Sequence, residues 1–558
     1  KYVNMSNQVN ELSVNWATLW EALADERPHD VAVVLGETEI QWGQLDERSA
    51  RLASVFSQQG VGNGSKVAQL LFNDAAYIES IYALFKLRAT PVNINYRYLQ
   101  GEIAYILNNS ESEVLVYHAS LAERVVGMKN LVPTLKTLIY VNDVGAEFVP
   151  EEGHLEYEAV LTRAAPAQRI ERSGEDLLFL YTGGTTGMPK GVMWRHVDLF
   201  GALAFSGYQA LGLPIPTTVQ QVGSTAAQLA SEKKSPTNLC AAPLMHGVAL
   251  FLAMSSFVLG GKVILLNSRK FVAKELIDLS EKYSVTQLSI VGDAFAKPIT
   301  RYLQALEEEG NSLPHLESII RITSSGATFS GEQKSLLQKY MPNATIIDML
   351  GASEGGPFGI AMTAPNEDPI ATAVFIAPPN AVTFNDETWE PLPRGSSTPG
   401  VLGVSGPMPQ GYFRDEAKSA QTFKVINGVR YTIPGDYALI NEQGVMQLLG
   451  RGSVCINSGG EKIYPEEVEV AARSIAGIAD CTVVGVPDDR FGNAVTAVVS
   501  RLPGATVTTE ELLSEMRKTL AAYKCPRHVL FVDAVYRSPS GKADYNITRD
   551  IAINLLKS

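Results

Sequence analysis

Segments with the hydrophobic patterns of strands and helices alternate along most of the chain. Residues 66–72 have the apolar content of a buried strand, Asp74 is a typical N-cap for a helix to about Arg88, and residues 91–94 begin another strand. The same order recurs as a strand at 317–323, a helix at 330–340 and a strand at 345–350. Such strand-helix-strand units form parallel sheets covered by helices. The pattern therefore predicts an α/β protein.

A glycine-rich stretch at 450–460 separates this long α/β region from a shorter tail. In the tail we predict a helix over 465–475, strands at 481–486 and 494–500, and a helix from 509 to about 522. We place the boundary at 451–453. The chain is therefore predicted to have a large N-terminal domain, residues 1–450, with sheets of parallel type, and a small α+β C-terminal domain, residues 451–558.

Residues 181–191 carry the strongest chemical signal. They read Tyr-Thr-Gly-Gly-Thr-Thr-Gly-Met-Pro-Lys-Gly, between an apolar run at 176–181 and another at 191–194, which predicts a loop between two strands. Glycine amides, threonine hydroxyls and the charge of Lys190 can together bind phosphate oxygens. The string differs from a Walker loop, because Pro189 precedes the lysine and Gly191 follows it.

This loop resembles the phosphate-binding signature of the adenylate-forming superfamily, which includes acyl-CoA synthetases, luciferases and the adenylation domains of peptide synthetases. Further motifs of that family follow in the same order, at 242–247, 324–327, 351–354, 434–436, 450–453 and 539–542. The string at 450–469 is most similar to bacterial fatty-acyl and steroid or terpenoid side-chain CoA synthetases. The resemblance covers nearly the whole chain.

The resemblance implies ATP, Mg²⁺ and CoA as cofactors and a two-step reaction with a mobile C-terminal domain that swings about Ser453. It assigns catalysis to Lys542, Glu354 and Thr186, and the metal to Glu354. It assigns ATP binding to Thr182, Gly183, Gly184, Thr185, Thr186, Gly187, Lys190, Gly326, Ala327, Leu350, Gly351, Ser353, Asp436 and Arg451. The acyl pocket is assigned to His246, Gly326 and Gly351, and the path of CoA to Gly459 and Gly460.

Two positions depart from the family pattern. Leu350 stands where the family often has a tyrosine that stacks on adenine, so it can cover the ring only by dispersion. Pro434 stands where a threonine is usual, which removes one hydroxyl contact but leaves Asp436 intact. The acid itself is not defined. Small residues at 201–207 either leave room beside the pocket or simply allow close helix packing.

Composition agrees with a soluble enzyme and disfavours nucleic acid as a partner. The chain has 558 residues, 46% of them hydrophobic, and a net charge of -13, which argues against nucleic acid as a partner.

Its four cysteines lack metal-ligand spacing, and its N-terminal residues lack the apolar core of a signal peptide, so we predict a cytoplasmic protein with buried thiols. The longest apolar run, 247–261, is too short to span a bilayer and predicts a buried core helix. The expected partners are a small carboxylic acid and CoA or a carrier protein, and a homodimer is also allowed.

Three other functions remain open from the sequence. An adenylating enzyme could pass the acyl group to a separate enzyme or carrier. Residues 351–355 also fit the Gly-x-Ser-x-Gly elbow of a serine hydrolase, with Ser353 as nucleophile and His528 as the only later histidine. A non-catalytic binding protein is disfavoured, because the lysine, carboxylate and phosphate-binding positions are all filled.

Overall fold

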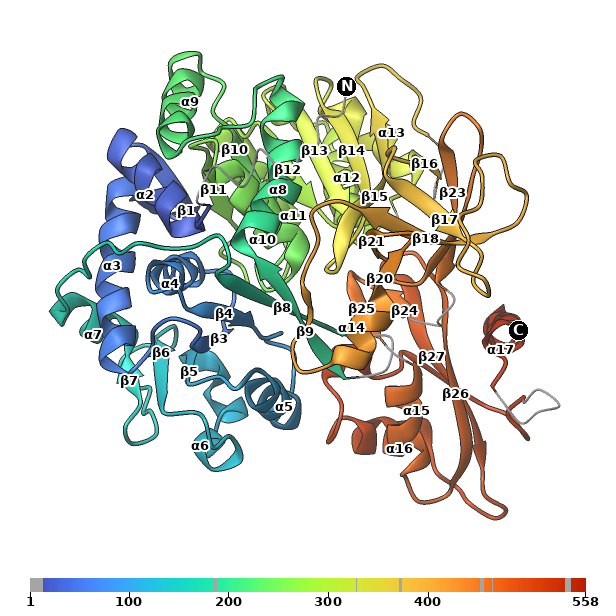
Figure 1. Cartoon of the computed structure of the whole chain (residues 1–558). Helices are drawn as coiled ribbons and strands as arrows, with labels where there is room; N and C mark the ends of the chain where they lie inside the picture. The colour runs from blue at the N-terminus through green and yellow to red at the C-terminus, as the bar shows by residue number, and fades with distance from the viewer. Residues whose placement is uncertain are drawn as a thin grey trace.

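The computed structural model describes residues 14–183, 188–327, 329–370, 374–451, 456–463, 465–536 and 543–557 (Figure 1). Sheets of eight and fifteen strands form the larger part of the chain, and sheets of two and three strands form its C-terminal part. The predicted α/β class, with a large N-terminal and a small C-terminal domain, is confirmed. The predicted boundary at 451–453 lies mostly outside the described residues and stays a prediction. Among those residues, no helix is both long and apolar enough to cross a membrane.

The eight-stranded sheet has the order β19-β9-β8-β4-β3-β5-β6-β7. Its central strands are parallel, as predicted, and the carboxylate of Asp74 accepts a hydrogen bond from the amide of Ala76 to cap α4. The strands are β3 Lys66–Leu70, β4 Thr90–Asn93, β5 Val114–His118, β6 Thr137–Val141, β7 Leu155–Glu156, β8 Leu177–Gly183, β9 Pro189–Arg195 and β19 Gly411–Tyr412. The helices of this region are α3 Trp42–Gln58, α4 Ala75–Lys86, α5 Gln100–Ser110, α6 Met128–Leu131 and α7 Tyr157–Arg163.

The fifteen-stranded sheet is parallel in its first part and antiparallel in its second. The parallel strands are β1 Val31–Leu35, β11 Lys262–Leu265, β10 Thr237–Cys240, β12 Gln287–Ile290, β13 Arg321–Ser325 and β14 Thr345–Ala352; the edge strand β2 Thr38–Gln41 is antiparallel to β1. The antiparallel extension comprises β15 Gly355–Thr363, β16 Val374–Ile376, β17 Ala381–Phe384, β18 Gly400–Ser405, β20 Phe423–Ile426, β21 Val429–Thr432, β22 Asp436–Ile440 and β23 Val445–Arg451. The strand predicted at 317–323 begins later, at Arg321, because a turn with a hydrogen bond from Ile319 N to Leu316 O precedes it.

Helices cover one face of the parallel part of this sheet. Leu288, Ile322 and Ile346 point into a core formed with α11, α12 and α13. The alternate residues of the same strands face the opposite side, as the period of two in a strand requires. The helices are α11 Ala273–Lys282, α12 Gly292–Glu308 and α13 Gly331–Tyr340.

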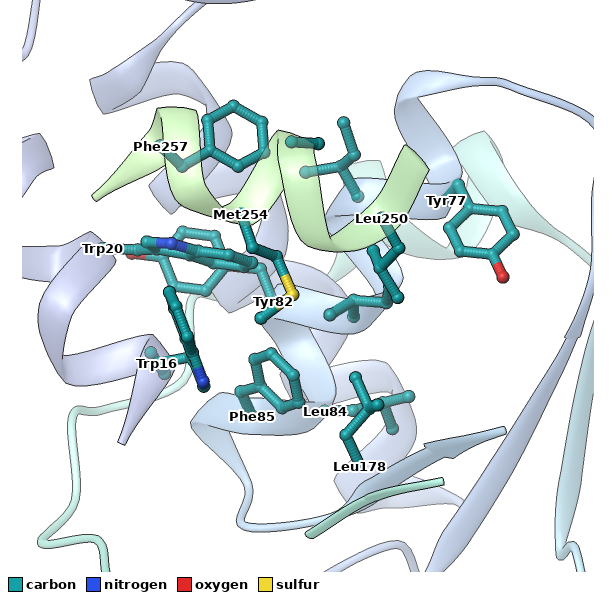
Figure 2. Packing of buried hydrophobic residues seen from close by; sticks show 14 of the residues in the cluster. Trp16, Trp20, Tyr77, Tyr82, Leu84, Phe85, Leu178, Leu250, Met254 and Phe257 are labelled. Carbon is teal, nitrogen blue, oxygen red and sulfur yellow. The ribbon is translucent and has the colours of Figure 1, made fainter. Parts of the chain in front are cut away.

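The run at 247–261 forms the predicted buried helix, α10 Gly247–Phe257, in the core of the large domain. Trp16 and Trp20 from α2 Trp16–Glu26 pack beside its residues Met254 and Phe257, together with aromatic side chains of α4 (Figure 2). The ring of Trp20 lies 5.6 Å from that of Phe257, in an edge contact. Burial of such large rings removes much apolar surface from water and fixes how the two sheets sit together.

The small domain occupies the lower right of Figure 1, in orange and red. Its elements are β24 Ile456–Ser458, β25 Glu461–Ile463, α15 Pro465–Arg473, β26 Ile478–Asp488, β27 Gly492–Arg501, α16 Thr509–Met516, β28 His528–Phe531 and α17 Tyr545–Lys557. The helix predicted to reach residue 522 ends at Met516, and the one predicted to reach 475 ends at Arg473. The hairpin of β24 and β25, the strand β28 and the helix α17 were not predicted.

Candidate active site

One large cavity, of about 1620 Å³, lies where the two domains meet. The carboxyl ends of β12, β13 and β14 line it, as do α8 His196–Gly207, α10 and the β24–β25 hairpin of the small domain. Ligands of α/β proteins bind at the carboxyl ends of parallel strands. The cavity therefore lies where the fold predicts a ligand site.

The segment 181–191 lies between two antiparallel strands, as predicted, but the strands extend further into it, because β8 ends at Gly183 and β9 begins at Pro189. Thr182 on β8 lines the cavity and is paired in register with Lys190 on β9. Residues 184–187, which include Thr185 and Thr186, lie outside the described residues. The ammonium of Lys190 pairs with the carboxylate of Asp415, the N-cap of α14 Glu416–Thr422, so its charge is already partly neutralised.

Two strand ends carry the predicted nucleotide residues into the cavity. Gly326 and Ala327 follow β13, and Gly326 has φ +85°, a conformation that favours glycine. Leu350 and Gly351, at the end of β14, line the same cavity. An aliphatic side chain thus stands where the family often has an aromatic ring.

Asp436 also lines the cavity, at the start of β22. Its register partner on the neighbouring strand is Arg451, so the fold brings together the backbones of two residues that the sequence assigned to one nucleotide. The side chain of Arg451 is not described.

Glu354 has the surroundings of a metal ligand. One carboxylate oxygen, Oε1, accepts a hydrogen bond of 2.8 Å from the hydroxyl of Tyr412. The other, Oε2, is buried and has no hydrogen-bond partner among the residues that the structure describes. A buried carboxylate oxygen left unpaired is costly, so a cation at this position is favourable. The backbone is held by Trp194, which donates to Ser353 O at 3.0 Å, and by Thr432, which donates to Glu354 O at 2.8 Å.

The described residues contain no group of three or more His, Cys, Asp or Glu side chains that could hold a metal ion by themselves. Mg²⁺ is commonly bound by one or two carboxylates together with substrate phosphates. Glu354 fits such a site better than a cage made only of protein ligands.

His246 precedes α10 and meets a residue that the sequence analysis missed, Glu461 of the small domain. The carboxylate of Glu461 lies 3.2 Å from His246 Nε2, 3.2 Å from Asn95 Nδ2 and 3.3 Å from Arg97 NH1. Burial alone would raise the pKa of Glu461, but the charges and hydrogen bonds of His246, Arg97 and Asn95 outweigh it and lower that pKa. The cluster therefore holds an ionised carboxylate between the two domains.

Gly459 and Gly460 place this carboxylate. They form the two-residue turn between β24 and β25, with φ +59° and +84°, as a tight hairpin requires. A Cβ atom at Gly460 would lie 3.3 Å from the side chain of Val291, tighter than an ordinary contact, and the left-handed backbone there also favours glycine. The hairpin thus reaches close to the strand ends of the large domain.

The small residues of α8 serve both roles that the sequence left open. Ala202 and Gly207 line the cavity, while Ala204 is buried in the core and Gly201 lies against Pro407. The side chain of Ser206 is not described.

Six cationic side chains from both domains line the cavity, and the sequence analysis did not find them. They come from separate segments, so no local motif marks them. The residues are Arg97, Arg269, Lys270, Arg490, Arg527 and Arg549.

The hydrolase interpretation gains no support from the geometry. Ser353 lines the cavity, but His528 lies on β28, in register with Thr496, and is not among the residues that line it. Within the described part of the chain, Ser353 has no histidine partner.

The predicted hinge Ser453 and the predicted catalytic Lys542 lie outside the described residues. Cys240, Cys481 and Cys525, the cysteines of the described part, are buried, as predicted.

Comparison with known proteins agrees with the two-domain organisation described above. A sequence model of the AMP-binding enzyme matches residues 20–413, and one of the AMP-binding enzyme C-terminal domain matches residues 467–542. A 3-oxocholest-4-en-26-oate CoA ligase from Rhodococcus rhodochrous is 38% identical over 547 residues, which cover 97% of this chain and 96% of that protein. A medium/long-chain fatty-acid and 3-oxocholest-4-en-26-oate CoA ligase from Mycolicibacterium smegmatis is 37% identical and covers 97% of each chain.

Solved structures share the arrangement of both domains. The amide bond synthetase McbA from Marinactinospora thermotolerans superimposes with a TM-score of 0.78 over 96% of this chain and 99% of its own, at 22% identity. A double mutant of o-succinylbenzoate CoA synthetase from Bacillus subtilis gives 0.75 over 96% and 98%, also at 22% identity. At these identities the likeness shows the fold alone.

Proposed function

Because this chain belongs to the AMP-binding enzyme family, we propose that it is an ATP-dependent acyl-CoA synthetase. It activates a carboxylic acid as the acyl-adenylate, with release of pyrophosphate, and then transfers the acyl group to CoA. The observation that carries this proposal is one cavity lined by apolar side chains of α8 and α10, by the strand ends with the nucleotide motifs, and by cationic side chains of both domains.

In the first step, an oxygen of the substrate carboxylate attacks the α-phosphorus of ATP, and the bond from that phosphorus to pyrophosphate breaks. The site must bring two anions together, which requires positioning and charge neutralisation. Thr182 and the loop that follows it bind the β and γ phosphates, Gly326, Ala327, Leu350 and Gly351 enclose the base, and Asp436 binds the ribose. We assign the approach to the α-phosphate to Lys542, on its family motif.

Glu354 is the proposed Mg²⁺ ligand, because its Oε2 is buried and no other described residue pairs with it. When bound, the ion supplies positive charge to the phosphates of ATP. Tyr412 orients the carboxylate through Oε1, and Thr432 and Trp194 fix its backbone.

In the second step, the sulfur of CoA attacks the acyl carbon, the thiol proton is lost, and AMP departs. The hairpin with Gly459, Gly460 and Glu461 already lies beside the proposed acyl pocket at His246, which supports an arrangement suited to this step. The cationic side chains that line the cavity suit the phosphates of CoA. We propose that adenylation uses a different arrangement, reached by rotation about Ser453, so the C-terminal domain is mobile.

The substrate is proposed to be a fatty acid or a bulky acid such as a steroid side-chain acid, as the names of the two relatives suggest. Leu199, Leu203, Phe251 and Leu252 of α8 and α10 give the chamber an apolar wall suited to either. A cytoplasmic location, a carrier protein as acceptor and a homodimer stay predictions from the sequence.

A panel of carboxylic acids, each assayed for pyrophosphate release with and without CoA, tests the proposal. We expect an apolar acid to support ATP-pyrophosphate exchange alone and acyl-CoA formation when CoA is present. Exchange without any acyl-CoA would favour an enzyme that only adenylates. No exchange with any acid, together with labelling of Ser353 by a fluorophosphonate, would favour the hydrolase.

A further inference from the structure

The chamber that the acyl group occupies in the proposed function is not apolar throughout. It runs along the face of β10, β12 and β13 that is turned away from the covering helices α11 to α13. On that face, Asn238, Gln287 and Arg321 line the cavity. They are register neighbours, Asn238 with Gln287 and Gln287 with Arg321, so they form one row across three adjacent strands.

This row lies far from the reacting carboxylate. Ser325, beside the nucleotide turn, also lines the cavity and stands four residues after Arg321 on β13. At about 3.3 Å per residue, the two Cα atoms are about 13 Å apart. A medium-length chain or a fused ring system bound with its carboxylate at the strand ends therefore has its far end near the row.

Two members of the row have hydrogen-bonding groups to spare. The amide of Asn238 is used, because it donates to Ser256 Oγ at 3.0 Å and accepts from Ser289 Oγ at 2.9 Å. Within the described residues, neither the amide of Gln287 nor the guanidinium of Arg321 has a side-chain partner, and no carboxylate pairs with Arg321. Burial lowers the pKa of Arg321, and no neighbouring charge acts in the opposite direction.

A partly buried guanidinium without a partner is unfavourable, and five N–H donors on it can receive an oxygen acceptor from a ligand. A purely hydrocarbon chain would leave these donors unpaired when it displaced water from the chamber. An acid with an oxygen at its far end would satisfy them instead.

We propose that Arg321 and Gln287 bind an oxygen acceptor, a keto group or a second carboxylate, at the end of the acyl substrate remote from the carboxylate that is activated. The enzyme thus selects oxygenated apolar acids over plain hydrocarbon acids. This inference rests on the proposed function, since it assumes that the chamber holds the acyl group.

The test compares a saturated monocarboxylic acid, the same acid with a keto group at its far end, the α,ω-dicarboxylic acid of equal length, and a 3-oxo steroid side-chain acid. Pyrophosphate release gives kcat/KM for each acid. We expect the oxygenated acids to be preferred by about 10- to 100-fold, the range of a hydrogen bond to a charged group. Preference for the keto acids alone indicates a neutral acceptor, and preference for the diacid alone indicates a carboxylate; either supports the proposal.

Arg321→Met should abolish the preference by raising KM for the oxygenated acids while it leaves the plain acid much less affected. Gln287→Met should reduce the preference for oxygenated acids in part, and it provides the test if Arg321→Met does not fold. Arg301→Met, which changes an exposed arginine of α12, is the matched control. An equal loss with every acid, or no preference in the unmutated enzyme, would overturn the proposal.

Calorimetric binding of the same acids without ATP separates this inference from the proposed function. Suppose that the unmutated protein releases no pyrophosphate but binds an oxygenated acid, and that Arg321→Met loses this binding. The proposed function is then refuted, but the oxygen-binding site at Arg321 is supported. If none of the acids binds, the site is refuted.

Discussion

The contact of Glu461 with the large domain predicts that one carboxylate controls the transfer step. We expect Glu461→Gln to slow transfer to CoA much more than adenylation. The change keeps the shape of the side chain but removes the charge that faces His246 and Arg97 at 3.2 and 3.3 Å. Adenylation should persist, since in our proposal it uses another domain arrangement.

The expected loss in Glu461→Gln depends on how exposed the side chains of Glu461, His246 and Arg97 are. Breaking a fully buried ion pair costs about 3 to 5 kcal/mol, but an exposed pair is worth about 1 kcal/mol or less. The side chain of Glu461 is 8% exposed, whereas those of His246 and Arg97 are 33% and 44% exposed. An intermediate loss of about 2 kcal/mol, or about 30-fold in the population of this arrangement, is therefore expected.

The assay measures both half-reactions on one preparation. ATP-pyrophosphate exchange reports adenylation, and acyl-CoA formed from supplied acyl-adenylate reports transfer. Since the pKa of Glu461 is lowered from its ordinary value of 4.5, its contribution is present above that pH and is lost as the pH falls through the lowered pKa. An equal loss of both half-reactions, or an unaltered transfer rate at pH 7, would refute this reasoning.

Three other perturbations probe the rest of the site and the core. Lys542→Ala should lower pyrophosphate exchange by about 100- to 1000-fold but spare transfer from supplied acyl-adenylate, and exchange near the parent rate would contradict the assignment. Glu354→Gln should weaken the use of Mg-ATP, with partial rescue at higher Mg²⁺, while Ser353→Ala should have a much smaller effect; the opposite ranking would revive the hydrolase. Burial and then the charge of Arg172 lower the pKa of His196 to about 3, so it stays neutral when folded but protonates in the unfolded chain below its ordinary value of 6.5. The free energy of unfolding should therefore fall by about 2 kcal/mol between pH 6.5 and 5, and denaturant titrations of His196→Gln should show no such slope.

Local signals explain what could be predicted from the chain alone. The helix capped by Asp74, the buried helix α10 and the strands on either side of the loop at 181–191 depend on patterns within a few residues. The family motifs are equally local, and their order placed Gly326, Leu350, Gly351 and Asp436 on one nucleotide before the fold showed them lining one cavity.

The misses lie where the pattern is non-local or ambiguous. The antiparallel half of the large sheet and the β24–β25 hairpin consist mostly of short strands, whose conformation is set by neighbours in space. The helix predicted to reach residue 522 ends at Met516 because propensity does not determine where packing ends a helix.

What the sequence determined by itself is the chemistry that each motif can carry, because a loop of glycine and threonine or a strand-end glutamate has its properties wherever it lies. Only the tertiary structure decided which distant residues act together. Glu461 meets His246 from 215 residues away, and Gln287 stands beside Arg321 only because β12 and β13 pair in parallel. Such contacts depend on the register of strands and the docking of domains, which arise from the summed burial of many side chains and leave no mark in any one segment.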